Sequence, residues 1–461
     1  MHGLIRPALD PNFQPMAVVY REYLKDVEKS GQAARLVVAI ERSAGQISVW
    51  ETKVFKDGHE DKRTIAVMDR VVKTLLWARG GFRIKISGHK GLYQHLKAAY
   101  APDGARAFDE DFMANVYEKP FEVVYAENPD DIATAVEKSA SVGRHLDGCR
   151  IGFDAGGSDR KVSAVIDGEA VYSEEVVWHP KVTADPKYHY EGILSAMKTA
   201  ASHMPRVDAI GVSSAGVYID NRIMVASLFL SVNKEDFAKH VKNMYIDIAK
   251  EIGDVPLEVA NDGDVTALAG AMSLEEGNLL GIAMGTSEAG GYVDEHMNIT
   301  GWLNELAFAP VDFNPEAMVD EWSGDYGCGV KYFSQDGVIK LAPAAGIALD
   351  EKASPAEKLK VVQGELEKGN RNAEKIFESI GTYFGYGVAY YSLFYDINHV
   401  LVMGRVTSGK GGSLLIKCAQ EVLDKDFPEL ARKITLHLPD EKSRRVGQSI
   451  AAASLPEIPK K

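Results

Sequence analysis

Cysteine is scarce in this sequence, and long apolar runs are absent. The 461-residue chain has 3 cysteines, which lie far apart at Cys149, Cys328 and Cys418. They form no disulfide framework and no CxxC metal pair, which is typical of a reducing compartment. No apolar run reaches the roughly 18 residues of a membrane-spanning helix, and the first residues, Met-His-Gly-Leu-Ile-Arg-Pro, lack the apolar stretch of a signal peptide. We therefore expect a cytoplasmic protein with no membrane partner.

Positive charge is also in deficit. The chain has 52 Lys and Arg against 66 Asp and Glu, a formal net charge of -14. Such a charge repels nucleic-acid phosphates, so no nucleic acid is expected as a partner. It does not exclude a small phosphorylated ligand in a local positive pocket. Hydrophobic residues at 46% and charged residues at 26% are ordinary for a globular protein, and the length predicts two or three domains.

An apolar strand that ends in a glycine turn organises the chain at residues 150–161. The turn carries five groups suited to a phosphate or a metal ion, namely Asp154, Gly156, Gly157, Ser158 and Lys161. Glycines let backbone N–H groups approach a phosphate with no Cβ in the way, and the acid could hold Mg²⁺ directly or through water. The alternative is an ordinary hairpin with solvated charges, since an apolar strand resumes at 162–166 and turns again at Asp167-Gly168.

Residues 1–147 show α/β patterning before this stretch. Apolar periodicity predicts strands at 36–40, 47–55, 82–86 and 121–125, and helices near 64–78, 90–100 and 129–142. A similar order of elements begins at residue 150, so this region could be a degenerate copy of that unit. Glu41–Gly45 stands there in place of the paired glycines, and no phosphate binding is expected. An unrelated α/β domain is the alternative.

Polar groups follow several later strands at the point where each strand ends. Glycine with a hydroxyl recurs at Gly285-Thr286-Ser287 and at Thr407-Ser408-Gly409, and two acids, Asp262 and Asp264, follow the strand 257–260. Open α/β sheets bind ligands at the carboxyl ends of their strands. Two such turns could hold the phosphates of a nucleotide, and an acid between them could take a proton from a substrate hydroxyl. Asp is also favoured as a helix N-cap, which is the alternative for Asp262 and the preferred role for Asp264.

In this order the motifs resemble those of the ROK family, which comprises sugar kinases and related repressors within the actin/hexokinase/Hsp70 superfamily. The motifs are Asp154–Ser158 with Lys161, Gly211–Gly216, Asn261-Asp262, Gly285-Thr286 with Gly290-Gly291, and Gly404–Gly409. The similarity covers roughly residues 150–455. It implies an α/β fold of two ribonuclease-H-like, actin-like ATPase lobes around a cleft, with bounds 148–258 and 259–461. Residues 1–147 would be an extra N-terminal α/β region.

The resemblance implies ATP-dependent phosphorylation of a sugar or sugar derivative, with ATP and Mg²⁺ as cofactors and a small-molecule sugar as partner. Asp262 would be the general base, and Asp154 would position Mg²⁺, possibly through water. The implied sugar contacts are Ser214, Gly216, Asn261, Asp262 and Glu305. The implied nucleotide and phosphate contacts are Gly156, Gly157, Ser158, Lys161, Gly285, Thr286, Gly404 and Ser408. The sequence also allows a homodimer.

The chain departs from the ROK pattern at two places. Phe308 stands where ROK sugar kinases have a histidine that contacts both sugar and zinc, and Cys328 is a lone cysteine where they have several. A single thiolate cannot make a structural zinc site, so no zinc is expected. The aromatic residues Trp302, Phe308 and Phe313 could stack on a sugar, but a place in the core is favoured for them.

These departures leave other functions open. One is a catalytically inactive relative that senses a sugar or a nucleotide, and another is a kinase for a non-sugar acceptor or a nucleotide-dependent hydrolase. A DNA-binding repressor is disfavoured, because the N-terminal region is patterned as α/β rather than as a helix-turn-helix and the chain is acidic.

Overall fold

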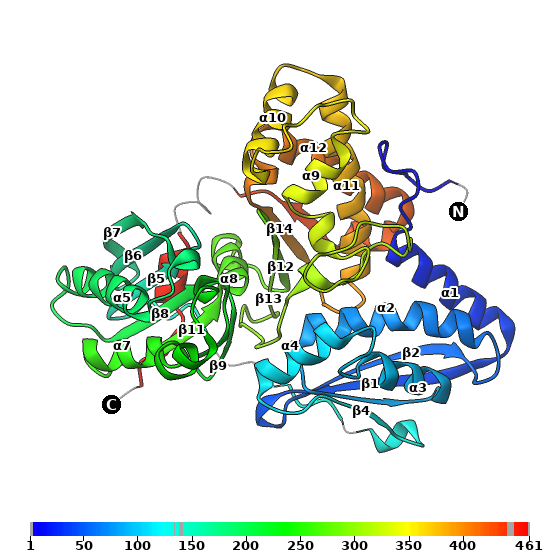
Figure 1. The fold of residues 1–461 in the computed structure, drawn as a ribbon, viewed down its shortest axis with the longest axis horizontal. Helices are drawn as coiled ribbons and strands as arrows, with labels where there is room; N and C mark the ends of the chain where they lie inside the picture. The colour runs from blue at the N-terminus through cyan, green and yellow to red at the C-terminus, as the bar shows by residue number, and fades with distance from the viewer. Residues whose placement is uncertain (1–2, 133, 138–141, 440–446, 460–461) are drawn as a thin grey trace. The chain divides into compact units, whose positions relative to one another are not determined.

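The structure is a computed structural model that describes residues 3–132, 134–137, 142–439 and 447–459. It divides into two compact units (Figure 1). Unit 1 comprises Met1–Lys138, Ile282–Gly290 and Trp302–Leu438, and unit 2 comprises Ser139–Gly281, Gly291–Gly301 and Pro439–Lys461. In the part of the chain so described, no helix has both the length and the apolar character needed to cross a membrane.

Unit 2 is built on a five-stranded sheet with the order β11-β8-β5-β6-β7 (Figure 1). Its strands are β5 (Cys149–Ala155), β6 (Asp159–Ile166), β7 (Glu169–Val177), β8 (Ala209–Ser214) and β11 (Leu257–Asn261). Strands β5, β8 and β11 are parallel, whereas β6 and β7 are antiparallel to their neighbours. The central strands β5 and β8 are buried along their whole length, as expected for parallel strands covered on both faces.

Helices and a hairpin complete unit 2. They are α5 (Pro186–Ala201), β9 (Val217–Ile219), β10 (Arg222–Val225), α6 (Lys234–Asp236), α7 (Met244–Ile252), α8 (Asp262–Leu274) and α15 (Gln448–Ala453). Helix α15 lies directly on β5 and β8, because glycines face it from both strands. A Cβ at Gly152 would lie 1.6 Å from the Ser449 oxygen, and one at Gly211 would lie 1.7 Å from the Ala452 oxygen. The C-terminal segment is thereby part of this unit.

The N-terminal part of unit 1 is a four-stranded sheet with the order β2-β1-β3-β4. Its elements are α1 (Met16–Ser30), β1 (Ala33–Glu41), β2 (Ile47–Phe55), α2 (Asp61–Arg79), β3 (Arg83–Ser87), α3 (Lys90–Ala99), α4 (Ala107–Tyr117) and β4 (Glu122–Tyr125). Strand β3 is antiparallel to β1, whereas β8 is parallel to β5. This difference in strand direction argues against the hypothesis that residues 34–147 are a degenerate copy of the unit at 150.

One local prediction for this region was wrong, and one helix, α4, was missed. The helix predicted near 129–142 is not formed at its start. Pro129–Asp131 makes a single 3₁₀ turn capped by Asn128, and Val136 exchanges two backbone hydrogen bonds of 2.9 Å with Ile47. The extended pairing at Val136 leaves no helical backbone there. Part of this predicted helix, residues 133 and 138–141, lies outside the described residues. The same holds for residues 443–446 of the helix predicted near 443–453.

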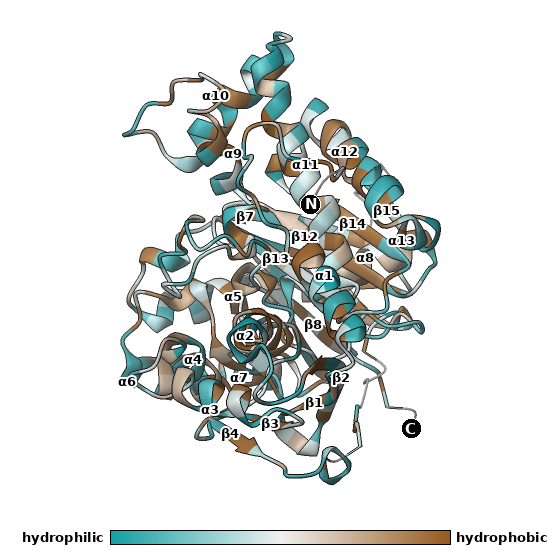
Figure 2. Ribbon diagram, turned by 90° about the vertical axis from the view of Figure 1, so that its right-hand side faces the viewer, coloured by the Kyte–Doolittle hydropathy of each residue, from teal (hydrophilic) through white to brown (hydrophobic). Residues whose placement is uncertain are grey.

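A third sheet has the order β13-β12-β14-β15. Its strands are β12 (Leu279–Met284), β13 (Glu288–Val293), β14 (His399–Met403) and β15 (Thr435–His437). The helices of this part are α9 (Gln335–Leu341), α10 (Pro355–Glu367), α11 (Arg371–Tyr391), α12 (Lys410–Asp426) and α13 (Pro428–Lys433). Figure 2 shows strands β8, β12 and β14 largely in brown, the colour of hydrophobic residues, in agreement with their burial.

The compact units differ in their bounds from the predicted domains. Residues 259–281 and 439–461, predicted in the second lobe, fall in unit 2 with the strands of the first. The N-terminal region, predicted as a separate segment, falls in unit 1 together with 302–438. Contacts of helix α2 explain why the N-terminal region belongs to unit 1.

Helix α2 binds the segment 303–325 of the same unit. The backbone N–H groups of Leu303, Asn304 and Glu305 donate to the last carbonyls of α2, at 3.2, 3.1 and 3.1 Å. The carboxylate of Asp325, only 9% exposed, accepts hydrogen bonds from three buried cations, Arg70, Lys73 and Arg106. Because these groups are buried and paired, the N-terminal region is joined to this segment rather than appended to it.

The ion cluster at Asp325 allows a test of this junction. Asp325→Asn leaves three buried cations around a neutral amide, and we expect it to lower the free energy of unfolding by about 3–5 kcal/mol. Denaturant unfolding measures the loss. The control is Glu321→Gln, whose carboxylate is 75% exposed and pairs with Lys331. That variant should lose no more than about 1 kcal/mol, and similar losses in both proteins would contradict the assignment.

Candidate functional site

The carboxyl edge of the parallel strands in unit 2 brings several predicted residues together. Asp154 lies beside Ser213 in the register of β5 and β8, and Ser214 lies beside Asn261 in the register of β8 and β11. Because the three strands are parallel and adjacent, these polar residues end the strands at one edge of the sheet. The structure thus places Asp154, Ser214 and Asn261 at the same edge of the sheet, on three neighbouring strands.

Asp154 is a buried carboxylate, 8% exposed. Burial raises its pKa to about 6, although Ser213 Oγ donates a hydrogen bond of 2.9 Å to its Oδ1 and thereby lowers it. The charge of Asp262 raises the pKa of Asp154 further. A carboxylate that is costly to ionise alone is stabilised when a cation binds it, so Asp154 fits a Mg²⁺ ligand. Ser213 was not among the predicted site residues.

The glycine turn at 156–158 joins β5 to β6. Trp178 holds it by donating from Nε1 to the Gly156 oxygen at 2.8 Å and from its backbone N–H to the Ser158 oxygen at 3.1 Å. Neither glycine has a positive φ. They are needed for space, since a Cβ at Gly156 would lie 2.7 Å from the Asp159 oxygen. Gly157 and Ser158 are exposed, so their backbone is open to a ligand.

Two lysines lie near this turn. Lys161, which was predicted, is opposite Asp154 on β6 and has its Nζ 3.6 Å from Glu175. Lys181, which was not predicted, belongs to the 3₁₀ turn Pro180–Val182. A Cβ at Gly157 would lie 2.7 Å from Lys181 Cε and 3.0 Å from its Nζ, so this side chain lies over the glycine turn. Lys181 stands outside every motif in the sequence, and no local pattern pointed to it.

Asp262 is the first residue of α8, directly after Asn261. Asn261 is the N-cap, because its Oδ1 accepts the N–H of Gly263 at 2.8 Å and its Nδ2 donates to the Gly216 oxygen at 2.7 Å. Burial raises the pKa of Asp262, while a 3.0 Å hydrogen bond from the same N–H and the charge of Lys181 lower it. The capping alternative therefore belongs to Asn261, and Asp262 presents a partly buried carboxylate beside it.

The other residues of this edge have structural partners. Ser214 Oγ accepts the hydroxyl of Tyr245 at 3.1 Å, and the Asp262 carbonyl accepts Gln448 Nε2 at 2.9 Å. Asp264 is buried, and its Oδ1 accepts the backbone N–H of Tyr292 at 3.3 Å. This contact joins the first turn of α8 to β13.

In unit 1, two predicted turns follow neighbouring strands of one sheet. Gly285 and Thr286 follow β12, and the Gly285 oxygen accepts the N–H of Gln335 at 2.9 Å. Gly404 follows β14 with φ 101°, and a Cβ there would lie 2.4 Å from the Met284 oxygen. Ser408 ends the 3₁₀ turn after Gly404, just before α12. The ends of β12 and β14 therefore touch, which brings these two turns together.

Glu305 and Phe308 lie on the segment bound by α2. The N–H of Glu305 donates to the Trp77 oxygen at 3.1 Å, and the Phe308 ring lies 4.4 Å from the Trp77 ring. Phe108 and Phe112 complete this aromatic cluster. Trp302 lies under the guanidinium of Arg79, 3.5 Å from Cζ to the ring centre. Trp302 and Phe308 thus pack against the N-terminal region, and the third predicted aromatic, Phe313, donates its backbone N–H to the Gln14 oxygen at 2.8 Å.

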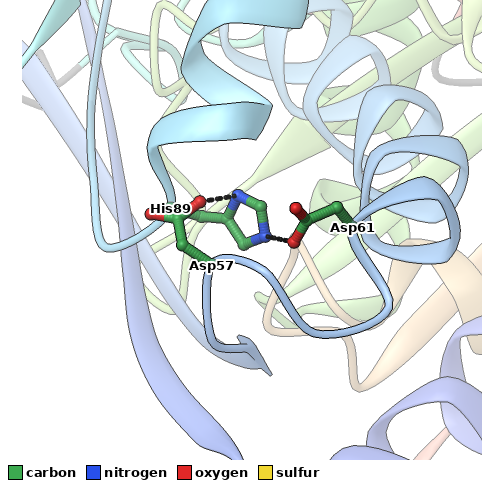
Figure 3. A group of neighbouring side chains, drawn as sticks. All are labelled: Asp57, Asp61 and His89. Atoms are coloured by element: carbon green, nitrogen blue, oxygen red, sulfur yellow. Dashed lines mark ion pairs between the residues drawn. The ribbon is translucent and has the colours of Figure 1, made fainter.

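A separate group of possible metal ligands comprises Asp57, Asp61 and His89 (Figure 3). His89 Nδ1 lies 3.0 Å from Asp57 Oδ1, and its Nε2 lies 3.4 Å from Asp61 Oδ1. The two carboxylates therefore face opposite sides of the ring, and Nδ1 also accepts the N–H of Leu92 as the N-cap of α3. This arrangement ties the start of α2 to the start of α3, and one possible ligand atom of each residue lies within 4.8 Å of the others.

Cys328 is buried, and its Sγ lies 3.8 Å from the Asp325 oxygen. It does not belong to the group at His89.

We expect treatment with EDTA to leave the thermal midpoint of the nucleotide-free protein unchanged, because no structural zinc is predicted at Cys328. Calorimetry before and after chelation measures this. A fall in the midpoint that added Zn²⁺ restores would contradict the prediction.

The strand order and directions of unit 2 are those of a ribonuclease-H-like lobe, and the protein has the α/β fold of the actin-like ATPases. No protein-family model matches the chain, and no curated protein matches it by sequence. Solved structures do match. A ROK hexokinase from Thermus thermophilus aligns over 66% of this chain and 97% of its own, with a TM-score of 0.51 and 16% identity.

A ROK family transcriptional regulator, a homologue of the E. coli MLC protein, aligns over 67% of this chain and 79% of its own. Its TM-score is 0.51 and its identity 17%. At these identities the likeness concerns the fold. The resemblance to ROK proteins found in the motifs is thereby confirmed at the level of the fold.

The raised pKa of Asp154 has a consequence for stability. A folded-state pKa of about 6, above the usual 3.8 of an aspartate, means that ionised Asp154 destabilises the fold above pH 6 and not below pH 4. At about pH 7.5 we expect Asp154→Asn to unfold at a higher urea concentration than wild type. Its free energy of unfolding should be larger by on the order of 2–3 kcal/mol. This difference should shrink as the pH falls toward about 5.

The control for Asp154→Asn is Asp247→Asn on α7, whose carboxylate is 57% exposed. It should change the unfolding free energy by no more than about 0.5 kcal/mol at either pH. A loss of stability in Asp154→Asn near neutral pH would contradict the assigned electrostatics.

Proposed function

We propose that this protein is a ROK-type kinase that transfers the γ-phosphoryl group of ATP to a hydroxyl of a sugar or sugar derivative. The observation that carries the proposal is the edge of the sheet in unit 2. There a buried carboxylate, Asp154, and an open glycine turn lie at the end of β5, and the carboxylate of Asp262 follows β11, with β8 between the two strands. Phosphoryl transfer depends on placing a metal-binding acid, a phosphate cradle and a base in this way.

In the proposed reaction the sugar oxygen forms a bond to the γ-phosphorus, and the bond from that phosphorus to the β–γ bridging oxygen breaks. ADP leaves, and the hydroxyl proton passes to Asp262. The raised pKa of Asp262 supports this role, because a base is most effective when its pKa approaches the working pH. Asn261 would orient a neighbouring hydroxyl, with Ser214 and Gly216 beside it.

Mg²⁺ would be held by Asp154, directly or through water, and would neutralise charge on the phosphates. Gly156, Gly157, Ser158 and Lys161 are proposed to line the phosphates. In unit 1, the turns at Gly285-Thr286 and Gly404–Ser408 are proposed nucleotide contacts, because glycine there exposes backbone at the ends of β12 and β14. Glu305 is proposed as a further sugar contact.

Phe308 favours a second candidate, a relative that binds sugar or nucleotide without turnover. Its ring packs on Trp77 and so supplies no polar contact to a sugar. A kinase for a non-sugar acceptor fits the same observation. The raised pKa values of Asp154 and Asp262 favour the enzyme, since perturbed acids gather at catalytic sites.

The test is ADP release with Mg²⁺ and ATP against a panel of hexoses, amino sugars and N-acetylated sugars. We expect acceptor-dependent release that falls by about 10²–10⁴-fold in Asp262→Asn, because the amide cannot take the proton. Asp247→Asn serves as the control and should retain full activity. Thermal midpoints of the variants no lower than that of wild type would exclude unfolding as the cause.

Two other outcomes would contradict the proposal. Release that survives in Asp262→Asn would remove Asp262 as the base. No release with any acceptor, together with a thermal shift on adding ATP or a sugar, would favour the sensor.

A further inference from the structure

We infer that Lys181 is a further phosphate-contacting residue of this site, whose ammonium binds the nucleotide phosphates over the glycine turn. This inference rests on the proposed function and adds to it a residue from an element that carries none of the recognised motifs. Its support is geometric and comes from unit 2 alone.

The position of Lys181 is defined by its distance from the turn. The hypothetical Cβ of Gly157 would lie 3.0 Å from Lys181 Nζ and 2.7 Å from Cε. The lysine side chain therefore passes directly over a residue that has no side chain of its own. A phosphate bound by the backbone N–H groups of this turn would meet the ammonium at hydrogen-bond range.

The backbone of Lys181 is held in place from two sides. Ser231 Oγ donates to the Lys181 oxygen at 2.6 Å, and the preceding residue, Pro180, is buried with its oxygen 3.0 Å from His189 Nε2. His189 is itself fully buried in α5. These contacts anchor the base of the side chain, so less conformational freedom is lost when the ammonium binds an anion.

The ammonium of Lys181 has no ion pair or hydrogen bond to any residue in the described ranges, and the side chain is exposed. Lys161 and Lys187, in contrast, each lie within 4 Å of a glutamate, at 3.6 and 3.5 Å. An ammonium offers three donors and one full charge, which suits the oxygens of a polyphosphate. Lys181 can therefore bind a polyphosphate without giving up an ion pair within the protein.

The local excess of negative charge explains why a cation is favourable at this position. Two carboxylates, Asp154 and Asp262, raise the negative charge at the edge where the phosphates would bind. The charge of Asp262 raises the pKa of Asp154 on β5 and of Tyr218 on β9, whereas Lys181 on the 3₁₀ turn acts on Asp262 itself. Lys181 is a cation, and it lowers the pKa of Asp262.

The variant that tests the inference is Lys181→Met, which keeps the length of the side chain and removes the charge. We expect the KM for ATP to rise by about 10- to 100-fold, as for the loss of one charged hydrogen bond. The pKa of Asp262 should rise when the ammonium is removed, so the acid limb of kcat/KM should move to higher pH. Lys181→Arg should restore both properties in large part.

Lys187→Met on α5 is the matched control, because it removes an exposed lysine of the same unit that is paired with Glu191. It should leave the KM for ATP and the pH profile unchanged. A structural role for Lys181 would lower the thermal midpoint without moving the acid limb. That result, or a wild-type KM and pH profile in Lys181→Met, would overturn the inference.

A binding measurement separates this inference from the proposed function. Titration calorimetry with Mg²⁺ and tripolyphosphate needs no acceptor and no turnover. We expect wild type and Lys187→Met to bind tripolyphosphate at least about tenfold more tightly than Lys181→Met. Absence of kinase activity with this difference intact would overturn only the proposed function. Equal affinities, including no binding by any of the proteins, would overturn the role of Lys181.

Discussion

The parallel pairing of β5, β8 and β11 is the constraint on which the candidate site depends. Its register places Asp154 beside Ser213 and Ser214 beside Asn261, so groups from three distant parts of the sequence end at one edge. The pairing in turn depends on burial of both faces of the sheet. Helix α15 covers one face closely because Gly152 and Gly211 leave room for its backbone. A polar edge at the end of a buried sheet is rigid, and rigidity is what a phosphoryl-transfer site requires.

The two carboxyl groups at this edge of the sheet are in an unfavourable electrostatic environment. Burial raises the pKa values of both Asp154 and Asp262, and the charge of Asp262 raises that of Asp154 further. Such a pair lowers the stability of the unliganded protein at neutral pH and is relieved when cations arrive. The protein supplies part of that relief through Lys161 and Lys181. A magnesium nucleotide would supply the rest, which links the cost in stability to the proposed binding.

The N-terminal region takes part in unit 1 through buried contacts. Three cations of this region converge on Asp325, and the carbonyl end of α2 accepts the backbone of 303–305. Phe308 and Trp302, which would face a sugar if they stacked on one, instead pack on Trp77 and Arg79. The segment that carries Glu305 is therefore supported by protein contacts, at the place where the ROK pattern leads one to expect zinc ligands.

The sequence alone determined the strands that end in glycine, hydroxyl or acid, and their order along the chain identified the fold. Those features are local, since a short apolar run, a turn and a cap depend on neighbouring residues. Only the tertiary structure decided which strand ends meet, that β3 runs antiparallel to β1, and that Val136 is extended rather than helical. It also placed Lys181 over Gly157 and Phe308 on Trp77. These are contacts between residues far apart in sequence, and they depend on how the elements pack, which periodicity and motif spacing do not encode.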